Sequence, residues 1–449
     1  MLSQIMYLNT FIFVLYILLI YNSGMDFKTH LIESIGLEEA NKILATLTND
    51  SFHAVLLDTN KISDDEFIKE FPLVKPHPIV KHAYLYDKDV YPLGKHLYHE
   101  LGYYYLQEPS AMVVSSLIDF KEDDLVLDMC AAPGGKSIQA SLKMNGKGLI
   151  ISNDLSFSRC GLLSNNLERL GIGNIVITNN DLEKIYAKYL NTFDKVILDA
   201  PCSGSGMFRK DELMESDWSI NKVYKFQEIQ KRLILIAYDM LKPGGLLSYS
   251  TCSYSKQEDE NVIEYLLENR DAELVNISAL KCNGIKEIGI RLSPANFPGE
   301  GHYICQIKKP GISQANRFTK INKFSSIVKE DLDVKKVNDY LFGVSNGIDL
   351  TGFNVYRYGL KIGEFKKDYF RYDLHYARSN PKGCFNIVEL SLEETLKYLE
   401  GEQINKVNSF KGYVLLTYKN NAIDIAKTDG TVIKNYYPKG LRKKINICG

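Results

Sequence analysis

A chain of 449 residues has room for several domains, at about 100–200 residues each. Its hydrophobic fraction of 45% and charged fraction of 24% are ordinary for a globular protein and exclude a largely disordered chain. The net charge of −1 averages two unlike parts: from Lys308 to the end, 25 Lys and Arg stand against 15 Asp and Glu, a net of +10, so the remainder has −11. This asymmetry favours an acidic enzyme body joined to a basic module that binds a polyanion, and the alternative is a solvated lysine-rich surface.

The eight cysteines exclude two further classes of protein. They are too few for a disulfide framework, and none belongs to a CxxC pair, so we expect no structural zinc and no other metal site. Cys202 and Cys252 lie in polar turns after apolar runs, whereas a cysteine kept for packing more often lies within the run. Thiols exposed to a site indicate a reducing compartment, so we expect a cytoplasmic protein.

The chain opens with an apolar run at residues 5–21 that only Asn9 and Thr10 interrupt. The run is long for the core of an export signal and slightly short for a membrane span, and no Lys or Arg precedes it. An ordinary soluble sequence begins at Met25. We interpret residues 1–24 as an apolar leader ahead of the true start of translation, with a membrane anchor as the alternative.

Residues 25–100 combine a helical pattern with a Pro-rich stretch at 71–80, where Pro72, Pro76 and Pro78 exclude regular helix. They predict a small N-terminal α+β domain.

Residues 101–310 alternate apolar runs with longer helical segments. The runs lie at 125–131, 148–154, 174–181, 193–200 and 245–252, and each is typical of a buried parallel strand. Between them, apolar residues recur at helical spacing, most clearly at 223–241. This alternation predicts a doubly wound, Rossmann-like α/β sheet.

The composition changes after residue 310. Residues 311–345 are predicted to be a linker, and 346–449 carry shorter elements rich in Tyr, Lys and Gly that predict a small α+β module. At 356–379, basic residues interleave with aromatic ones, a pattern that suits contact with phosphates and stacking on bases. The alternative is that these aromatic residues form the core of the module.

The turn after the first predicted strand suits a ligand. Asp128 ends the strand, and Pro133, Gly134 and Gly135 lead into a helix. Small residues let a ligand approach the backbone, and a helix N-terminus offers free N–H donors. The pattern is neither GxGxxG nor a Walker loop, so nucleotide phosphates fit poorly. Lys136, on the first turn of the helix, either positions a substrate or carboxylate or is solvated.

Acidic residues also end the next strands. Asp154 follows the second run, where a carboxylate can accept hydrogen bonds from both hydroxyls of a ribose, and Asp181 follows the third, where it could contact an adenine. Each could instead cap a helix. With Asp128 and Asp199 they end four successive strands, which favours one shared site.

The segments at 193–211 and 248–261 each place a cysteine, Cys202 or Cys252, just past a strand end, where both thiols could face one pocket. The thiolate is the reactive form, and neighbouring N–H groups or cations raise its fraction. The alternative is a pair of inert buried cysteines.

On these residues, and on 103–112 and 435–442, the chain resembles the Nop/Sun family of RNA cytosine-5 methyltransferases over roughly 26–449, most closely its bacterial ribosomal-RNA branch. The resemblance implies a class I methyltransferase sheet and a C-terminal RNA-binding domain of the PUA type. It implies that Cys252 is a covalent nucleophile and that Cys202 helps to release the product. It further implies that S-adenosylmethionine is the cofactor and is bound by Cys130, Ala131, Ala132, Pro133, Gly134, Gly135, Lys136, Asp154, Asp181 and Asp199.

The chemistry of cytosine supports these roles. Carbon 5 is too weakly nucleophilic to attack a methyl sulfonium directly, but addition of a thiolate at carbon 6 gives an enamine-like ring whose carbon 5 can attack. Asp199 can hydrogen-bond the ring nitrogen and exocyclic amine and stabilise the charge that develops there. Methylation of the amine needs no such nucleophile, so paired cysteines favour carbon. The target base must be unpaired or flipped into the pocket.

Some positions depart from the family pattern. Relatives carry an arginine and an asparagine where this chain has Leu56 and Asp58, and a glutamate where it has Ser205. Residues 294–297 lack an expected histidine. These departures affect RNA placement more than methyl transfer, so they leave the substrate more open than the reaction.

We therefore expect a monomeric enzyme that methylates carbon 5 of cytosine in ribosomal RNA, in the decoding region of the small subunit, either as free RNA or within a subunit. Its N-terminal domain would place the RNA. We expect no binding to DNA or membranes. The alternatives are a tRNA cytosine-5 methyltransferase and a non-catalytic RNA-binding factor for ribosome assembly; intact Cys252, Cys202 and Asp199 argue against the latter.

Overall fold

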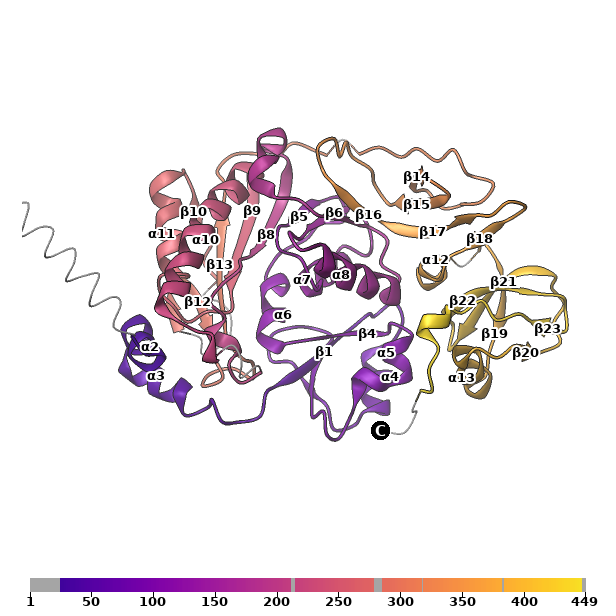
Figure 1. Cartoon of the computed structure of the whole chain (residues 1–449), viewed down its shortest axis with the longest axis horizontal. Helices are drawn as coiled ribbons and strands as arrows, with labels where there is room; N and C mark the ends of the chain where they lie inside the picture. Colours follow the sequence, from indigo (N-terminus) through magenta and orange to yellow (C-terminus); the bar gives the residue numbers. More distant parts are fainter. Residues whose placement is uncertain (1–24, 211–214, 278–284, 317, 382, 446–449) are drawn as a thin grey trace, which may run out of the picture.

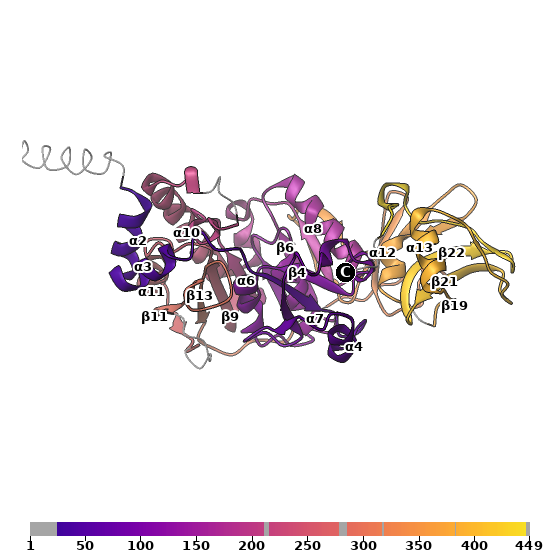
Figure 2. The same cartoon turned by 90° about the horizontal axis from the view of Figure 1, so that it is seen from below.

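The computed structural model describes residues 25–210, 215–277, 285–316, 318–381 and 383–445, and the predicted leader at 1–24 lies outside them. The molecule is elongated, with two N-terminal helices at one end, two small sheets at the other and a large sheet between them (Figures 1 and 2). In the part of the chain that the structure describes, no helix has the length and apolar character that a membrane span requires.

The N-terminal part forms two separate pieces. Helices α2 (Phe27–Ile35) and α3 (Leu37–Leu44) pack together around Leu31, Ala40 and Ile43 and against Tyr254 of the central part. The rest is an antiparallel sheet in the order β2-β3-β1-β4. Its elements are β1 (His53–Leu57), α4 (Asp64–Glu70), β2 (Lys75–Pro76), β3 (Ala83–Tyr86), η1 (Leu93–Lys95), α5 (Leu97–Glu100) and β4 (Tyr104–Gln107). The proline-containing β2 lies at an edge, where a missing N–H costs no ladder hydrogen bond.

The central sheet confirms the predicted doubly wound α/β class. Five parallel strands run in the order β9-β8-β5-β6-β7, and strand order reverses between β5 and β8. The strands are β5 (Leu125–Asp128), β6 (Leu149–Asn153), β7 (Ile175–Thr178), β8 (Phe193–Asp199) and β9 (Leu241–Thr251). The helices are α6 (Pro109–Ser116), α7 (Gly135–Lys143), α8 (Phe157–Leu170), α10 (Ile220–Met240) and α11 (Glu260–Asn269), with 3-10 turns η2 (Leu182–Lys184), η3 (Tyr186–Tyr189) and η4 (Ser205–Met207).

Both faces of this sheet are buried. On β5, Leu125 and Leu127 join a core with α10 and α11, whereas Val126 joins a second core with α7 and α8. Successive side chains of a strand point to opposite faces, so near-continuous apolar runs are what a sheet covered on both sides requires.

Antiparallel strands extend the central sheet at both edges. Beyond β9 the order continues β13-β12-β11, and β10 pairs with β13; the strands are β10 (Glu273–Leu274), β11 (Ile285–Glu287), β12 (Gly289–Leu292) and β13 (His302–Lys308). At the opposite edge, β16 (Val355–Tyr358) pairs with β7. A strand from the C-terminal half thus completes the central sheet, which the sequence pattern does not predict.

The C-terminal half contains two further sheets. One has the order β14-β15-β17-β18, with β14 (Asp333–Val337), β15 (Tyr340–Val344), β17 (Leu360–Phe365) and β18 (Phe370–Tyr372). The other has the order β19-β21-β22-β23-β20, with β19 (Asn386–Glu389), β20 (Ile404–Asn405), β21 (Gly412–Tyr418), β22 (Asn421–Thr428) and β23 (Val432–Ile433). Helices α12 (Leu374–Arg378) and α13 (Leu392–Glu400) and the turn η5 (Lys439–Leu441) complete it.

The predicted linker at 311–345 needs correction, because β14 and β15 lie within it. Its first residues are also fixed: the amide of Asn316 donates to Asp194 at the start of β8 (2.6 Å). The strands escaped prediction because Lys335, Lys336 and Val337 of β14 are all exposed, so its apolar pattern is weak.

The N-terminal sheet and the last sheet share one hydrophobic core. Val55 and Leu57 of β1 belong to the same buried cluster as Val414 and Leu416 of β21. A polar contact reinforces it, since the ammonium of Lys443 pairs with Glu100 (2.7 Å), and in Figure 1 helices α4 and α5 lie between the two sheets. The N-terminal sheet and the last sheet therefore form one packed unit, whereas α2 and α3 pack elsewhere.

Candidate active site

The acidic residues predicted to mark a site gather at the carboxyl edge of the central sheet. Asp128 and Asp199 are the last residues of β5 and β8, and Asp154 directly follows β6. This edge, next to the reversal of strand order, is where open α/β sheets bind ligands.

The turn between β5 and α7 requires glycine and leaves the first N–H groups of α7 without a side-chain cap. Gly134 has a φ of 115°, in the left-handed region, and a Cβ there would lie 2.5 Å from the side chain of Leu163. No side chain caps the first N–H groups of α7. Asp154 is tied to the same turn, because its carboxylate accepts hydrogen bonds from the N–H groups of Ala132 (3.2 Å) and Ser156 (2.9 Å).

Asp128 has unused hydrogen-bonding capacity. Its side chain is fully buried, and Oδ2 accepts a hydrogen bond from the hydroxyl of Ser137 (2.6 Å). Oδ1 has no hydrogen-bond partner within the described ranges. Burial raises the pKa of this carboxyl to about 7, against the opposing effect of Ser137. A buried acceptor without a donor is costly, so the site suits a ligand with donors or positive charge.

Asp181 differs from the other acids. It caps the 3-10 turn η2 by accepting a hydrogen bond from the N–H of Glu183 (3.2 Å), and it pairs with Lys184 (3.1 Å). The capping role that the sequence left open is therefore present in the structure.

Asp199 carries a set of polar partners. The ammonium of Lys136 lies 2.6 Å from Oδ2, the hydroxyl of Ser250 donates to Oδ1 (2.7 Å), and Nε2 of His302 lies 3.4 Å from Oδ1. Burial alone would raise the pKa of Asp199, but Lys136 and His302 outweigh it and hold the pKa below its usual range. The Lys136 side chain is thus paired with a carboxylate rather than solvated.

His302 is a site residue that the sequence interpretation missed. It opens β13, which is otherwise mainly apolar, and its side chain is 5% exposed. A histidine at the start of a buried strand was the available signal.

The thiols of the two cysteines that were predicted to share a pocket are in contact. Sγ of Cys202 and Sγ of Cys252 lie 3.1 Å apart, both are free cysteines, and both residues are partly exposed. The contact with Cys252, followed by burial, raises the pKa of the Cys202 thiol well above its usual value. Burial also raises the pKa of Cys130, which keeps that thiol protonated in the turn before α7. Cys202 and Cys252 are therefore two free thiols in contact at the ends of neighbouring strands.

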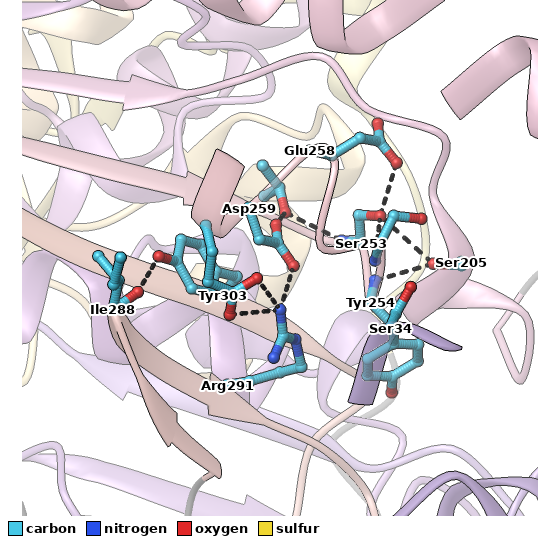
Figure 3. A network of polar contacts seen from close by, with 12 residues as sticks. Ser34, Ser205, Ser253, Tyr254, Glu258, Asp259, Ile288, Arg291 and Tyr303 are labelled. Carbon is cyan, nitrogen blue, oxygen red and sulfur yellow. Dashed lines mark hydrogen bonds and ion pairs between the residues drawn. The ribbon is translucent and has the colours of Figure 1, made fainter. Parts of the chain in front are cut away.

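A buried network holds the strand end that carries Cys252 (Figure 3). The hydroxyl of Thr251 donates to Asp259 (2.6 Å), and Arg291 contacts both Asp259 (3.0 Å) and Glu260 (2.7 Å). The side chain of Arg291 has no exposed area.

We expect Arg291→Met to lower the free energy of unfolding by about 3–5 kcal/mol, because it leaves two carboxylates buried without their cation. Burial already raises the pKa of Asp259, and removing Arg291 raises it further. The protonated form of Asp259 is then favoured in the folded variant. The loss of unfolding free energy caused by Arg291→Met should therefore shrink as the pH falls and grow as the pH rises.

Urea unfolding at several pH values measures this effect, with Arg371→Met at an exposed position as the control. A loss below about 1 kcal/mol at neutral pH, as for an ordinary surface substitution, would contradict the expectation.

Comparisons with known proteins agree with this geometry. The family model described as 16S rRNA methyltransferase RsmB/F matches residues 115–308, and the methyltransferase RsmF PUA domain matches 385–443. The ribosomal RNA small subunit methyltransferase F of Shewanella piezotolerans is 32% identical over 438 residues, covering 87% of this chain and 91% of the relative. The chain belongs to the RsmB/F family. The ribosomal RNA small subunit methyltransferase F of Shewanella woodyi is 30% identical over 432 residues, covering 86% of this chain and 90% of that relative.

Solved structures place this RsmB/F member in the same fold. A methyltransferase homologue from Pyrococcus horikoshii is 29% identical with a TM-score of 0.54, covering 62% of this chain and 93% of that one. The structure of NSun6 from the same organism with SFG has a TM-score of 0.56 and covers 64% of this chain and 98% of that one. At 22% identity this likeness supports only the fold. The resemblance to RNA methyltransferases and the class I fold with a PUA domain are confirmed.

Ser205, one of the departures of this RsmB/F member from the family pattern, lies in the first of the two cysteine segments (193–211 and 248–261). The residue is buried in η4, and its hydroxyl oxygen accepts the N–H of Tyr254 (2.9 Å; Figure 3). Ser205 thus joins the two cysteine segments, so this departure concerns their packing and not an exposed RNA contact.

Proposed function

We propose that the protein transfers a methyl group from S-adenosylmethionine to carbon 5 of a cytosine in 16S rRNA, through a covalent adduct with Cys252. The observation that carries the proposal is the contact between the Cys202 and Cys252 thiols beside the Asp199–Lys136 pair. Methylation at an amine or a hydroxyl has no use for two such thiols. The relatives, named as small subunit methyltransferases, indicate the class of RNA.

The residues of the first turn fit the proposed cofactor. S-adenosylmethionine supplies, when bound, a methyl group on a cationic sulfonium. Residues 130–136 and Asp154, Asp181 and Asp199 would hold it, with the open N–H groups of α7 and the unpartnered oxygen of Asp128 as further contacts. A set of four carboxylates suits a cationic ligand with hydroxyl and ammonium donors better than a phosphate.

The residues around the thiols support a sequence of balanced steps. The thiolate of Cys252 adds to carbon 6, so the C5=C6 electron pair becomes available at carbon 5 for the methyl group. Asp199 stays ionised, because its pKa is held low, and accepts hydrogen bonds from the amine and from the protonated ring nitrogen. The Lys136 ammonium, in contact with this carboxylate, is a source of that proton.

Cys202 then serves the release step. A base must take the proton from carbon 5, after which the electron pair restores the C5=C6 bond and expels the Cys252 thiolate. The contact with Cys252 is the largest cause that raises the pKa of Cys202. Once Cys252 is a thioether this cause is gone, so the pKa of Cys202 falls, its thiol loses its proton to solvent, and the resulting thiolate can accept the proton from carbon 5.

We further propose that the C-terminal half holds the RNA, together with residues 25–100. Lys335, Phe342 and Lys361 face one another across β14, β15 and β17. Lys335 is exposed, whereas Phe342 is partly buried against the central core and Lys361 pairs with Asp373 (2.9 Å). Arg371 is exposed on β18, and Tyr340 lies under the ammonium of Lys361 (4.9 Å). Cations beside exposed rings suit phosphates and stacked bases.

Other residues of the predicted basic and aromatic stretch belong to the core instead. Arg357 is buried and pairs with Glu168 (2.6 Å), and Tyr376 has no exposed area. For this part of the stretch, the alternative therefore holds that its residues form the core of the C-terminal module.

Bisulfite sequencing of total RNA from cells with and without the gene tests the proposed function. We expect one 5-methylcytosine to disappear from 16S rRNA and to return with the wild-type gene but not with Cys252→Ala. Loss of a tRNA signal alone would replace the proposed substrate with tRNA. An unchanged pattern would overturn the enzymatic proposal and favour a non-catalytic role.

A further inference from the structure

A carboxylate that takes no part in the proposed steps, that of Glu258, connects the two cysteine segments (193–211 and 248–261). Glu258 precedes α11 and is fully buried (Figure 3). Its Oε1 accepts the N–H of Ser203 (2.8 Å), and its Oε2 accepts the hydroxyls of Ser203 (2.5 Å) and Ser253 (2.6 Å). Ser203 directly follows Cys202, and Ser253 directly follows Cys252.

The sheet does not provide this connection. The parallel pairing of β8 and β9 ends at Asp199 and Ser250, with one further bond from the N–H of Ala200 to the carbonyl of Ser250 (2.8 Å). Both cysteines lie beyond that point, in segments without regular pairing. The spacing of the thiols therefore depends on contacts between the segments themselves.

Other contacts also join these segments, among them the approach of the Ser253 hydroxyl to those of Ser203 (3.4 Å) and Ser205 (3.5 Å). The N–H of Gly206 donates to the carbonyl of Cys252 (2.8 Å), and the N–H of Tyr254 donates to Ser205 (2.9 Å). Glu258 differs because its one carboxylate accepts hydrogen bonds from the residue that follows each cysteine.

The energetics also set Glu258 apart. The carboxylate is buried with hydrogen-bond donors and, among the described residues, in no ion pair with a cation. A buried carboxylate costs several kcal/mol unless donors compensate it, and an apolar residue of similar size is often as stable or more so. The position is therefore better suited to fixing geometry than to adding stability.

We propose that Glu258 is a positioning residue that holds the thiols of Cys202 and Cys252 in register, so that one can accept the carbon-5 proton while the other is bound to carbon 6. The inference rests on the proposed function for its role in catalysis. The spacing itself is a property of the free protein.

Oxidation by diamide, without RNA or cofactor, tests the spacing directly. Diamide takes two hydrogen atoms from two neighbouring thiols and leaves a disulfide, and peptide mass spectrometry quantifies the Cys202–Cys252 pair over time. We expect the wild type and Glu258→Gln, which keeps the shape and most hydrogen bonds, to close at similar rates. We expect Glu258→Ala to close at least about tenfold more slowly, because proximity is lost.

Single-turnover methylation of 16S rRNA gives the second readout. We expect Glu258→Ala to lose about 100-fold in rate with cofactor binding unchanged, and Glu258→Gln to recover most of it. Glu100→Gln is the control, since Glu100 is also buried but pairs with Lys443 away from the cysteine segments, and we expect it to close its disulfide at the wild-type rate.

If Glu258→Ala does not fold, the double variant Ser203→Ala with Ser253→Ala removes the same hydroxyl contacts from the other side. Disulfide closure at the wild-type rate in a folded Glu258→Ala, or in that double variant, overturns the proposal. Slow closure supports it even if no variant methylates RNA, and that second result would count against the proposed function alone.

Discussion

Cys252→Ala should abolish methylation, with a rate at least about 10⁴-fold below that of the wild type, as expected when a covalent nucleophile is removed. Without the thiolate, carbon 5 has no route to nucleophilic character, however well the cofactor binds. Transfer of a labelled methyl group from S-adenosylmethionine to 16S rRNA measures the rate. Isothermal titration of the cofactor should give an unchanged affinity, because Cys252 follows β9 and the proposed cofactor turn follows β5.

Cys384→Ala is the matched control, since Cys384 is a free cysteine in the C-terminal half. It should keep the wild-type rate. A Cys252→Ala protein with more than a tenth of the wild-type rate would refute the assignment of the nucleophile. Loss of cofactor affinity together with activity would point to a structural fault instead.

Cys202→Ala should trap the enzyme on its product. If Cys202 takes the carbon-5 proton, its removal leaves methylated RNA attached to Cys252, because the electrons that expel the thiolate come from that C–H bond. Denaturing electrophoresis after incubation with RNA and cofactor should then show a slow-migrating species. Treatment with RNase should return it to the mobility of the free protein.

The double variant Cys202→Ala with Cys252→Ala provides the control, because it has no thiol to form the adduct. If Cys202→Ala turns over at the wild-type rate with no slow-migrating species, another group takes the proton and the contact at 3.1 Å has a different role.

The sequence predicted the parts of the fold whose signal is local. Apolar runs such as 125–131 became buried strands, and the turn with Gly134 became the open N-terminus of α7. Asp199 and both cysteines follow strand ends, so rules for parallel sheets sufficed to bring them together.

The remaining features depend on contacts between distant segments. Strand β16 joins the sheet only because the C-terminal half folds back on β7, and no pattern within 355–358 indicates that partner. Glu258 and Arg291 look like ordinary helix-end and strand charges in the sequence. Their burial, and the approach of His302 to Asp199, follow from the placement of α11 and β13 beside β9.

The pairing of β16 with β7 has a consequence for the choice of target. Main-chain hydrogen bonds anchor the C-terminal half to one edge of the sheet, while the reactive thiols lie on the other side of β5, after β8 and β9. If the C-terminal half holds the RNA and Cys252 attacks the base, as proposed, the distance between the held nucleotide and the reacting one is constant. Selection among cytosines would then depend on the three-dimensional path of the RNA between two fixed points, so distant parts of the RNA sequence could specify the modified base.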